Sequence, residues 1–331
     1  MKRLIKKGRE KVVFDKIEEA INKNKNFLIL THVNPDGDAL GSQLALRRIL
    51  RSLNKNVYAL AEERIPPMYK FLPDIDKIYT DYKRFKSRFD VVFILDCPTI
   101  ARVGKIESLI SDSLIINIDH HPGRRKEMDI VFKDTNAAAT AILIYKLFKN
   151  MKVKIDKKTA LLLYVGIVTD TGFFRYANTN SEAYKISSEL VKLGVVPNEV
   201  NKQLYESESI RRLKLLGLSL ETIRLYKGGK ISTMETTRDM YAKTGGRPEY
   251  TEDFVNFPKS IKGVSIAVFF KEDTKTRTVK VSFRAKGKID VDKIARIFGG
   301  GGHPQASGCT LKGTIRENKD KVIRILKKFM E

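Results

Sequence analysis

Three short apolar runs in the first half of the chain each end in a cluster of polar residues. NFLILTH spans residues 26–32, DVVFILD spans 90–96 and SLIINID spans 113–119. Each run is brief and rich in β-branched residues, which is typical of a strand buried on both faces of a sheet. Longer segments between and after the runs have the length and spacing of helices: residues 39–53, 136–150 and 157–171. Strands that alternate with helices predict an α/β domain, with a parallel sheet and helices on both of its faces.

The polar residues stand at the place where such a sheet binds its ligands. In an open parallel sheet, ligands bind beyond the carboxyl ends of the strands. All three runs place their polar residues at that end. The sequence therefore predicts that the functional site of the first domain lies along this edge of the sheet.

The second half of the chain has a different pattern. Residues 181–226 are more polar and helical in spacing, and the strand-like segments GKISTME, GVSIAVFF and RTVKVSFRAKG follow, then the helix-like DVDKIARIF. The part after the helical segment has about 100 residues, a typical size for an independent domain. We therefore expect a first domain over residues 1–185, a helical connector over 186–226 and a smaller α+β domain over 227–331.

Side chains of types that can bind metal ions follow the first strand-like run. His32, Asp36 and Asp38 lie in THVNPDGDALGS, where Pro35 and Gly37 favour a tight turn before a helix. One aspartate can be explained as a helix N-cap, which accepts hydrogen bonds from the first helical N–H groups. The N-cap explains neither the histidine nor the second carboxylate. A mixed set of imidazole and carboxylate donors suits Mn²⁺, Fe²⁺ or Zn²⁺.

Further carboxylates and a second histidine stand at the ends of later apolar segments. Asp96 ends the second run, Asp119 and His120 follow the third, and Asp170 lies near the end of the segment 157–171. A single aspartate after a strand also suits a turn. Several buried carboxylates at one sheet edge are costly unless they share cations. The set supplies enough ligands for two metal ions about 3.5–4 Å apart, the arrangement that hydrolyses phosphate esters.

The motifs together resemble those of the DHH phosphoesterase superfamily with a DHH-associated domain of the first type. They are NPDGDALGS at 34–42, the strand-end Asp96, DHH at 119–121, TDTG at 169–172 and GGGGHPQASG at 299–308, in the family's order. The length of the chain favours the nano-RNase branch, the bifunctional oligoribonucleases and pAp phosphatases that include cyclic-dinucleotide phosphodiesterases. The glycine run argues against family II inorganic pyrophosphatases, which share only the motifs of the first half.

The resemblance implies two metal ions, and manganese is the usual metal of the family. Asp96 would bridge the two ions. The implied ligands are His32, Asp36 and Asp96 for one ion, and Asp38, Asp96, His120 and Asp170 for the other.

The adjacent histidines receive different roles. A regular strand would direct His120 and His121 to opposite faces, but a turn at Pro122 and Gly123 allows both to face one cleft. The resemblance makes His120 a metal ligand, and it makes His121 and Asp119 the catalytic residues. His121 would donate a hydrogen bond to the scissile phosphate, and Asp119 would orient a histidine ligand. A hydroxide between the ions would attack phosphorus in line with the leaving ribose oxygen.

The resemblance also implies a substrate-binding site in the second domain. Gly300, Gly301, Gly302 and His303 belong to GGGGHP, whose backbone N–H groups can approach an anion closely. A glycine run is also typical of a flexible loop. Arg284 matches the family's substrate-binding arginine, which can hold a phosphate through two hydrogen bonds. The alternative for Arg284 is an ordinary basic residue on a strand.

The chain is strongly basic. Its 63 Lys and Arg residues exceed its 39 Asp and Glu residues, which gives a formal charge of +24. This excess favours phosphate-rich partners, but a genome-wide or thermophilic bias also produces lysine-rich surfaces. Arg124 and Arg125 depart from the family's commoner pattern after DHH, and they either bind a nucleotide phosphate or are solvated. The role of the basic first ten residues stays open.

The remaining features favour a cytoplasmic protein. Cys97 and Cys309 stand far apart and form no metal-binding or disulfide pattern. The start, MKRLIKKGREKVVFDKIEEAI, predicts an amphipathic helix, since it lacks the apolar region of a signal peptide. No apolar run approaches the about 20 residues of a membrane span. We therefore expect no membrane partner, and the sequence leaves a homodimer open.

These observations predict a two-domain hydrolase that uses two divalent metal ions. The first domain would hold the ions and the second would bind the far end of a nucleotide. A site closed between two domains favours short substrates: dinucleotides such as pApA, short RNA or DNA oligonucleotides, and pAp, with cyclic di-AMP as a further candidate. Two alternatives stay open, a RecJ-like exonuclease that degrades longer single strands and a non-catalytic protein that binds nucleotides or RNA through its charge.

Overall fold

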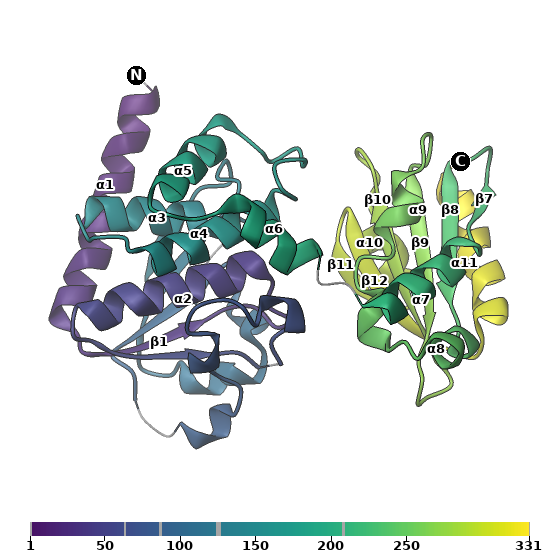
Figure 1. Cartoon of the computed structure of the whole chain (residues 1–331), viewed down its shortest axis with the longest axis horizontal. Helices are drawn as coiled ribbons and strands as arrows, with labels where there is room; N and C mark the ends of the chain where they lie inside the picture. Colours follow the sequence, from purple (N-terminus) through teal and green to yellow (C-terminus); the bar gives the residue numbers. More distant parts are fainter. Residues whose placement is uncertain (1, 63, 86–87, 124–126, 207–208, 331) are drawn as a thin grey trace. The chain divides into compact units, whose positions relative to one another are not determined.

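A computed structural model gives the structure of the chain except for residues 1, 63, 86–87, 124–126, 207–208 and 331. Arg124 and Arg125 therefore lie outside the described residues. The chain divides into two compact units, residues 1–207 and 208–331 (Figure 1). The segment 186–226, which the sequence suggests as a connector, contributes to both units.

The first unit contains a six-stranded sheet in the order β3-β2-β1-β4-β5-β6. All neighbouring strands run parallel, which confirms the predicted α/β class. The three apolar runs of the sequence form its centre, as β1, β4 and β5. The strands are β1 (Asn26–Leu30), β2 (Asn56–Leu60), β3 (Ile78–Tyr79), β4 (Val91–Leu95), β5 (Leu114–Asp119) and β6 (Ile130–Lys133).

Apolar cores lie on both faces of this sheet, because successive side chains of a strand point to opposite faces. In β1, Phe27 and Ile29 join the core beneath the α-helices, whereas Leu28 and Leu30 join a core that includes residues of the 3₁₀ segment η4 (Ile100–Leu109). Figure 1 shows α2, α3 and α4 together on one side of β1. The α-helices are α1 (Lys2–Lys23), α2 (Gly37–Ser52), α3 (Thr140–Asn150), α4 (Lys157–Asp170), α5 (Ser181–Lys192) and α6 (Pro197–Tyr205), and the short 3₁₀ turns are η1 (Pro67–Tyr69), η2 (Ile75–Lys77) and η3 (Tyr82–Arg84).

Helix α3 begins later than the sequence indicates. The pattern predicts a helix from residue 136, but the backbone is still extended at Ala139, with φ −161° and ψ 154°, and Thr140 is the first helical residue. Ala139 has no side chain that can cap the helix, so the first N–H groups of α3 need a partner from elsewhere in the chain. The two other predicted helices begin within two residues of the expected position, as α2 and α4.

Helices α2 and α4 pack closely because glycines stand where they cross. A Cβ atom on Gly41 would lie 2.4 Å from the carbonyl oxygen of Leu162, and one on Gly166 would lie 2.8 Å from Oδ1 of Asp38. Such contacts are too short for any side chain. The glycines therefore set the separation of the two helices that carry Asp38 and Asp170.

We expect Gly41→Ala to destabilise the chain, although alanine is normally the better helix residue by about 0.5–1 kcal/mol. The added methyl group overpacks the α2–α4 contact, which typically costs about 1–3 kcal/mol. The change is checked by chemical denaturation followed by circular dichroism. Gly217→Ala in α7 (Ile210–Leu220) is the control, because a Cβ there meets no atom within 4 Å. A stabilising Gly41→Ala would contradict the close packing.

The second unit contains a mixed six-stranded sheet in the order β11-β12-β10-β9-β8-β7. Strands β8 and β9 are parallel, and the other neighbours are antiparallel. One face of the sheet packs against α10 and α11, and the other packs against α7, α8 and α9. Its elements after α7 are β7 (Arg224–Tyr226), β8 (Ile231–Thr236), α8 (Arg238–Thr244), η5 (Pro248–Thr251), α9 (Asn256–Ser260), β9 (Ile266–Glu272), β10 (Thr278–Ala285), α10 (Val291–Ile297), β11 (Gly301–His303), β12 (Ala306–Lys312) and α11 (Ile315–Phe329).

Two further features concern membrane spans and cysteines. Among the described residues, no helix combines the length and the apolar composition that crossing a bilayer requires. Cys97 and Cys309 are both buried.

Candidate metal centre

The predicted metal ligands meet at the carboxyl edge of the first sheet. His32 and Asp36 follow β1, Asp96 follows β4, and His120 follows β5. Helices α2 and α4 supply the remaining two, because Asp38 lies in the first turn of α2 and Asp170 is the last residue of α4. The fold thus brings together side chains that are far apart in the sequence.

Asp96 lies at the centre of this group and is almost fully buried, with 2% of its surface exposed. Its Oδ2 atom lies 3.5 Å from Nε2 of His32, and its Oδ1 atom lies 3.5 Å from Nε2 of His120. The backbone at Asp96 has a positive φ of 53°. Residues other than glycine rarely adopt this conformation, and aspartate tolerates it better than most. The turn after β4 therefore holds the carboxylate between histidines from two different strands.

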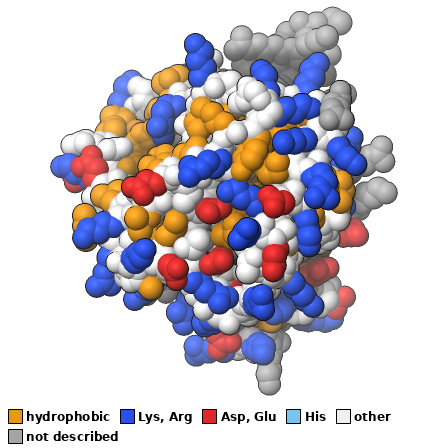
Figure 2. All heavy atoms as spheres, turned by 90° about the vertical axis from the view of Figure 1, so that its right-hand side faces the viewer, with side chains coloured by type: hydrophobic (Ala, Val, Ile, Leu, Met, Phe, Trp, Pro, Cys, Tyr) orange, Lys and Arg blue, Asp and Glu red, His pale blue; other side chains and the backbone are white. Residues whose placement is uncertain are grey.

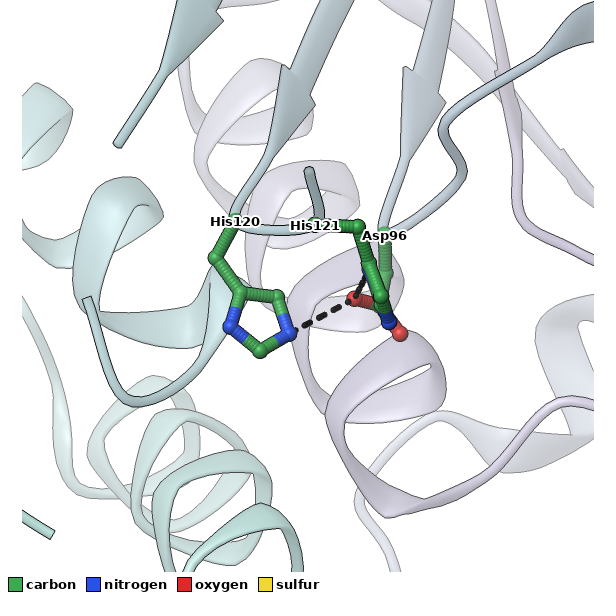
Figure 3. A group of neighbouring side chains, drawn as sticks. All are labelled: Asp96, His120 and His121. Atoms are coloured by element: carbon green, nitrogen blue, oxygen red, sulfur yellow. Dashed lines mark ion pairs between the residues drawn. The ribbon is translucent and has the colours of Figure 1, made fainter. Parts of the chain in front are cut away.

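His120 and His121 both face Asp96, although they are neighbours in the sequence (Figure 3). Nδ1 of His121 also lies 3.5 Å from Oδ1 of Asp96. The two rings meet edge to face, with centroids 4.5 Å apart. The chain has left the regular strand after Asp119, so the alternation of side chains no longer separates the two histidines.

Three overlapping groups of donor atoms are compact enough to hold metal ions. Within each group, one donor atom per residue lies within 4.8 Å of the others. The groups are His32, Asp36 and Asp96; Asp38, His120 and Asp170; and Asp96, His120 and His121. Imidazole nitrogens and carboxylate oxygens are a donor set for divalent transition metals.

The hydrogen bonds of the histidines leave the nitrogen that a metal needs. Nδ1 of His32 lies 2.7 Å from the carbonyl oxygen of Val33, and Nδ1 of His120 lies 3.1 Å from that of Ala137. A carbonyl oxygen only accepts, so Nδ1 carries the proton and neutral Nε2 carries the lone pair. Nε2 of His120 is buried and has no hydrogen-bond partner in the described part of the chain. A metal ion would satisfy this atom, so the residues fit the group that the sequence implies.

The carboxylates repel one another in the metal-free protein. Burial and the charge of Asp96 raise the pKa of Asp36 and of Asp170, that of Asp170 to about 8. The same two causes raise the pKa of Asp38. Positive charge brought into this group would relieve the repulsion.

The histidines and Asp96 change one another's pKa values at the centre of the group. Burial alone would raise the pKa of Asp96, but the neighbouring histidines outweigh burial and lower it. Burial would lower the pKa of His32, but the hydrogen bond and the charge of Asp96 outweigh burial and raise it. Burial lowers the pKa of His120, which favours the neutral imidazole that can bind a metal.

Asp36 also serves as a helix N-cap. Its Oδ1 atom accepts hydrogen bonds from the backbone N–H groups of Asp38 and Ala39, each at 3.0 Å. The N-cap alternative of the sequence is therefore correct for Asp36. The residue still belongs to a metal-sized group with His32 and Asp96, so capping and metal binding are compatible.

Asp119 contacts His121. Its Oδ1 atom accepts a hydrogen bond from the backbone N–H of His121 at 3.1 Å and lies 2.8 Å from the ring atom Nδ1. Asp119 is fully buried, whereas the side chain of His121 is partly exposed. The residue that the sequence suggests as orienting a metal-binding histidine thus orients the second histidine of the DHH motif.

The two histidines can be separated by substitution. We expect His120→Ala to weaken Mn²⁺ binding by more than about 100-fold, because even the hydrogen-bond partners of a ligand are worth about 10–100-fold. We expect His121→Ala to retain metal binding and to lower kcat by about 10²–10³, as for the loss of one donor to developing charge. Calorimetric titration with Mn²⁺ and steady-state rates measure the two effects. Equal loss of metal binding in both variants would refute the assignment of different roles to His120 and His121.

In the second unit, two predicted substrate-binding residues share one row across the sheet. Arg284 on β10 and His303 on β11 both pair with Ala306 of β12. Their Cα atoms are thus two strand spacings apart, about 10 Å. Paired residues point to the same face, and the residue between them is small. Burial, and after it the charges of Arg284 and Lys286, lower the pKa of Lys259, so cations gather around Arg284.

The second half of the glycine run lies in a strand, and the first half leads into it from the turn after α10. Gly301, Gly302 and His303 form β11 and pair with β12. A Cβ on Gly300 would lie 2.1 Å from the carbonyl oxygen of Gly308, so this glycine is required by the backbone that passes beside it. Gly302 has a φ of 153° and a similarly close neighbour. The structure thus gives these glycines a packing reason that the sequence did not indicate.

On one face of the molecule, the positive charge is spread over the surface. On the face of the molecule in Figure 2, Lys and Arg side chains lie among acidic and apolar ones and do not form a single basic stripe. The charge of +24 therefore does not by itself mark a nucleic-acid groove on that face.

Sequence reasoning missed Thr140 and Asn178, which hold the predicted ligands. Oγ1 of Thr140 donates a hydrogen bond to Oδ1 of Asp96 at 2.9 Å. Nδ2 of Asn178 donates to the backbone carbonyl of Asp170 at 3.0 Å. Neither residue binds metals readily, so only the three-dimensional contact reveals its place in the site.

Comparison with known proteins places this arrangement in a family. Residues 26–167 match the model of the DHH family N-terminal domain, and residues 238–331 match that of the DHHA1 domain. A protein of Thermus thermophilus, named bifunctional oligoribonuclease and PAP phosphatase NrnA, is 34% identical over 86% of this chain and 84% of its own length. The chain belongs to the DHH family of phosphoesterases.

Two further proteins extend the likeness over nearly the whole chain. The Bacillus subtilis protein of the same name is 32% identical, over 85% of this chain and 87% of its own length. The crystal structure of an exopolyphosphatase-related protein from Bacteroides fragilis superposes with a TM-score of 0.89 and 30% sequence identity. It covers 96% of this chain and 95% of that one. The DHH fold therefore accounts for both units.

Proposed function

We propose that this chain is a metal-dependent hydrolase that cleaves short oligonucleotides to mononucleotides and pAp to AMP. The observation that carries the proposal is the set of overlapping His and Asp groups around Asp96. The printed activity of the Thermus thermophilus and Bacillus subtilis relatives supports this choice of substrates. In the proposed division, residues 1–185 catalyse, 186–226 connect and 227–331 bind substrate.

The site would hold two divalent ions, for which we propose Mn²⁺. When bound, the ions would lower the pKa of water and neutralise charge on the phosphoryl group. Asp96 would contact both ions, because its two oxygens face histidines on opposite sides. The proposed ligands are His32, Asp36 and Asp96 for one ion and Asp38, Asp96, His120 and Asp170 for the other.

His121 would act on the phosphate, with Asp119 orienting its ring. Nδ1 of His121 faces the buried carboxylate of Asp119, so Nε2 is the nitrogen that can reach a substrate. We propose that Nε2 of His121 donates a hydrogen bond to a phosphoryl oxygen, whose negative charge increases during the reaction.

The second unit would bind another phosphate of the substrate. Arg284 and His303 share a row across the sheet, and Lys259 lies near Arg284. Arginine can hold a phosphate through two parallel hydrogen bonds. The backbone N–H groups of Gly300, Gly301 and Gly302 are the other proposed donors.

A substrate panel tests the proposal. With Mn²⁺ present, the full chain is given a labelled dinucleotide, pApA, pAp, cyclic di-AMP and a twenty-residue RNA, and initial rates are compared. We expect the dinucleotides and pAp to be hydrolysed faster than the long strand. A preference for the twenty-residue RNA would favour a RecJ-like exonuclease. Binding without turnover under Mn²⁺, Mg²⁺ and Zn²⁺ would favour a nucleotide-binding protein.

A further inference from the structure

Residues 137–141, in the sequence AAATA, bond to three of the proposed ligands directly and to a fourth through Asn178. The segment leads into α3 and is buried throughout. Its contacts involve Asp38, Asp96, His120 and Asp170, through backbone atoms, one hydroxyl group and one bridging side chain. These four residues are the proposed ligands of one ion. The segment itself carries no metal-binding side chain.

Two of the contacts occur at the start of α3. The carboxylate of Asp38 accepts hydrogen bonds from the N–H groups of Thr140 at 2.6 Å and Ala141 at 2.9 Å. These are the N–H groups that Ala139 leaves uncapped, so Asp38 caps a helix that lies far from it in the sequence. The positive end of the helix dipole also favours a carboxylate at this place. Both oxygens of Asp38 are thereby oriented.

The other contacts hold His120 and Asp170. The carbonyl oxygen of Ala137 accepts from Nδ1 of His120, which directs Nε2 of that ring into the site. The carbonyl oxygen of Ala138 accepts a hydrogen bond from Nδ2 of Asn178 at 3.0 Å. The same nitrogen donates to the backbone carbonyl of Asp170 and lies 3.4 Å from its Oδ2 atom. Asn178 thus ties the end of α4 to the start of α3.

The contact with Asp96 is made on one side of the carboxylate. Thr140 donates to Oδ1, the oxygen that faces His120, whereas Oδ2 faces His32. The hydrogen bonds of the other proposed ligand set go elsewhere. His32 bonds to the carbonyl of Val33, and Asp36 caps α2. The described hydrogen bonds of the segment 137–141 therefore reach the ligand set of one proposed ion, and they reach the other set only through the shared residue Asp96.

We propose that residues 137–141 position the ligands of the ion held by Asp38, Asp96, His120 and Asp170, and that Thr140 is the positioning residue of this segment. The inference rests on the proposed function, because it assumes that the cluster binds two ions. Loss of the Thr140 hydroxyl leaves Oδ1 of Asp96 beside a methyl group in a buried place. The Oδ1 atom of Asp96 then lacks the hydrogen bond that orients it and that stabilises its negative charge.

Titration of the metal-free full chain with Mn²⁺ tests the proposal, using Thr140→Val and Thr140→Ser. Valine keeps the shape of threonine and removes the hydroxyl, whereas serine keeps the hydroxyl. We expect Thr140→Val to weaken one of two binding steps by about 10–100-fold and to leave the other largely unchanged. Thr140→Ser is expected to restore the weakened step. Thr159→Val is the control, because that equally buried threonine bonds with Arg48 near the start of α4.

The outcomes separate the inference from the function on which it rests. If the unaltered chain binds no Mn²⁺, the proposed function is wrong and the inference falls with it. If the unaltered chain binds two ions and Thr140→Val binds them equally well, only the inference is wrong. Equal weakening of both steps would overturn the assignment to one ion. If Thr140→Val does not fold, Asn178→Ala is the second variant, since its exposed side chain ties Asp170 to the same segment and should weaken the same step.

Discussion

Asp96→Ala is expected to lower kcat/KM for a dinucleotide by about 1,000-fold or more. Metal ions contribute several kcal/mol to the stabilisation of a phosphoryl-transfer transition state, and each 1.36 kcal/mol corresponds to about tenfold in rate. Asp96 is the only carboxylate among the proposed ligands whose two oxygens each lie 3.5 Å from a different histidine of the set, within the residues that the structure describes. Its loss should therefore affect both ions. Steady-state rates with Mn²⁺ and a Mn²⁺ titration measure the effect.

A buried aspartate outside the site provides the control. Asp134 is 6% exposed and accepts a hydrogen bond from the N–H of Asn136 at 3.1 Å, and it belongs to none of the metal-sized groups. Asp134→Ala is expected to lower stability while Mn²⁺ binding and turnover per folded molecule are retained. Full activity of Asp96→Ala would contradict the proposal that Asp96 contacts both ions.

Adding Mn²⁺ to the metal-free protein is expected to raise the melting temperature of the first unit by about 10 °C. An ion present at about 1,000 times its Kd stabilises the folded state by about 4 kcal/mol, and 1 kcal/mol corresponds to about 2–4 °C for a unit of this size. The physical source is relief of the repulsion among Asp36, Asp38 and Asp170, whose pKa values burial and Asp96 raise. Thermal melts followed by circular dichroism, with and without a chelator, measure the change.

The increase in melting temperature that Mn²⁺ produces should become larger between pH 6 and pH 8. Burial and Asp96 raise the pKa of Asp170 from 3.8 to about 8, so in this range the folded metal-free chain holds a proton that the unfolded chain releases. The metal-free protein therefore loses stability as pH rises towards 8, because its folded state binds more protons than its unfolded state. Protons also compete with Mn²⁺ for the carboxylate at the lower pH.

His120, whose pKa burial lowers, acts in the opposite direction only below about pH 6.5. The Asp96→Ala variant serves as the control for the melts, since it should lose most of the gain. A gain from Mn²⁺ that is equal at both pH values would contradict the raised pKa of Asp170.

The central strands and the metal-ligand cluster could be predicted because they depend on local patterns. A buried parallel strand is an apolar run, and its carboxyl end marks the ligand edge, so β1, β4 and β5 led directly to His32, Asp96 and His120. The outer strands β2, β3 and β6 are partly exposed, and they show no such run. Their positions depend on pairing with the central strands.

The supporting contacts could not be predicted, because they join distant parts of the chain through ordinary residues. Thr140 and Ala141 bond to Asp38 only because α2, α3 and α4 pack together. The start of α3 was misplaced for the same reason, since its cap comes from another helix. In the second unit, the glycine run suggested an anion-binding or flexible loop, whereas its close approach to β12 depends on how the sheet forms.

The proposed metal ligands follow an order along the chain that matters during protein synthesis. His32, Asp36 and Asp38 leave the ribosome early, Asp96 and His120 come next, and α4 with Asp170 comes last. Domains fold as units while the chain is made, and the cap of α3 requires α2 to be in place. The proposed two-ion centre could therefore form only when the first unit is nearly finished, so an incomplete nascent chain would not carry the proposed activity towards the nucleotides and RNA around the ribosome.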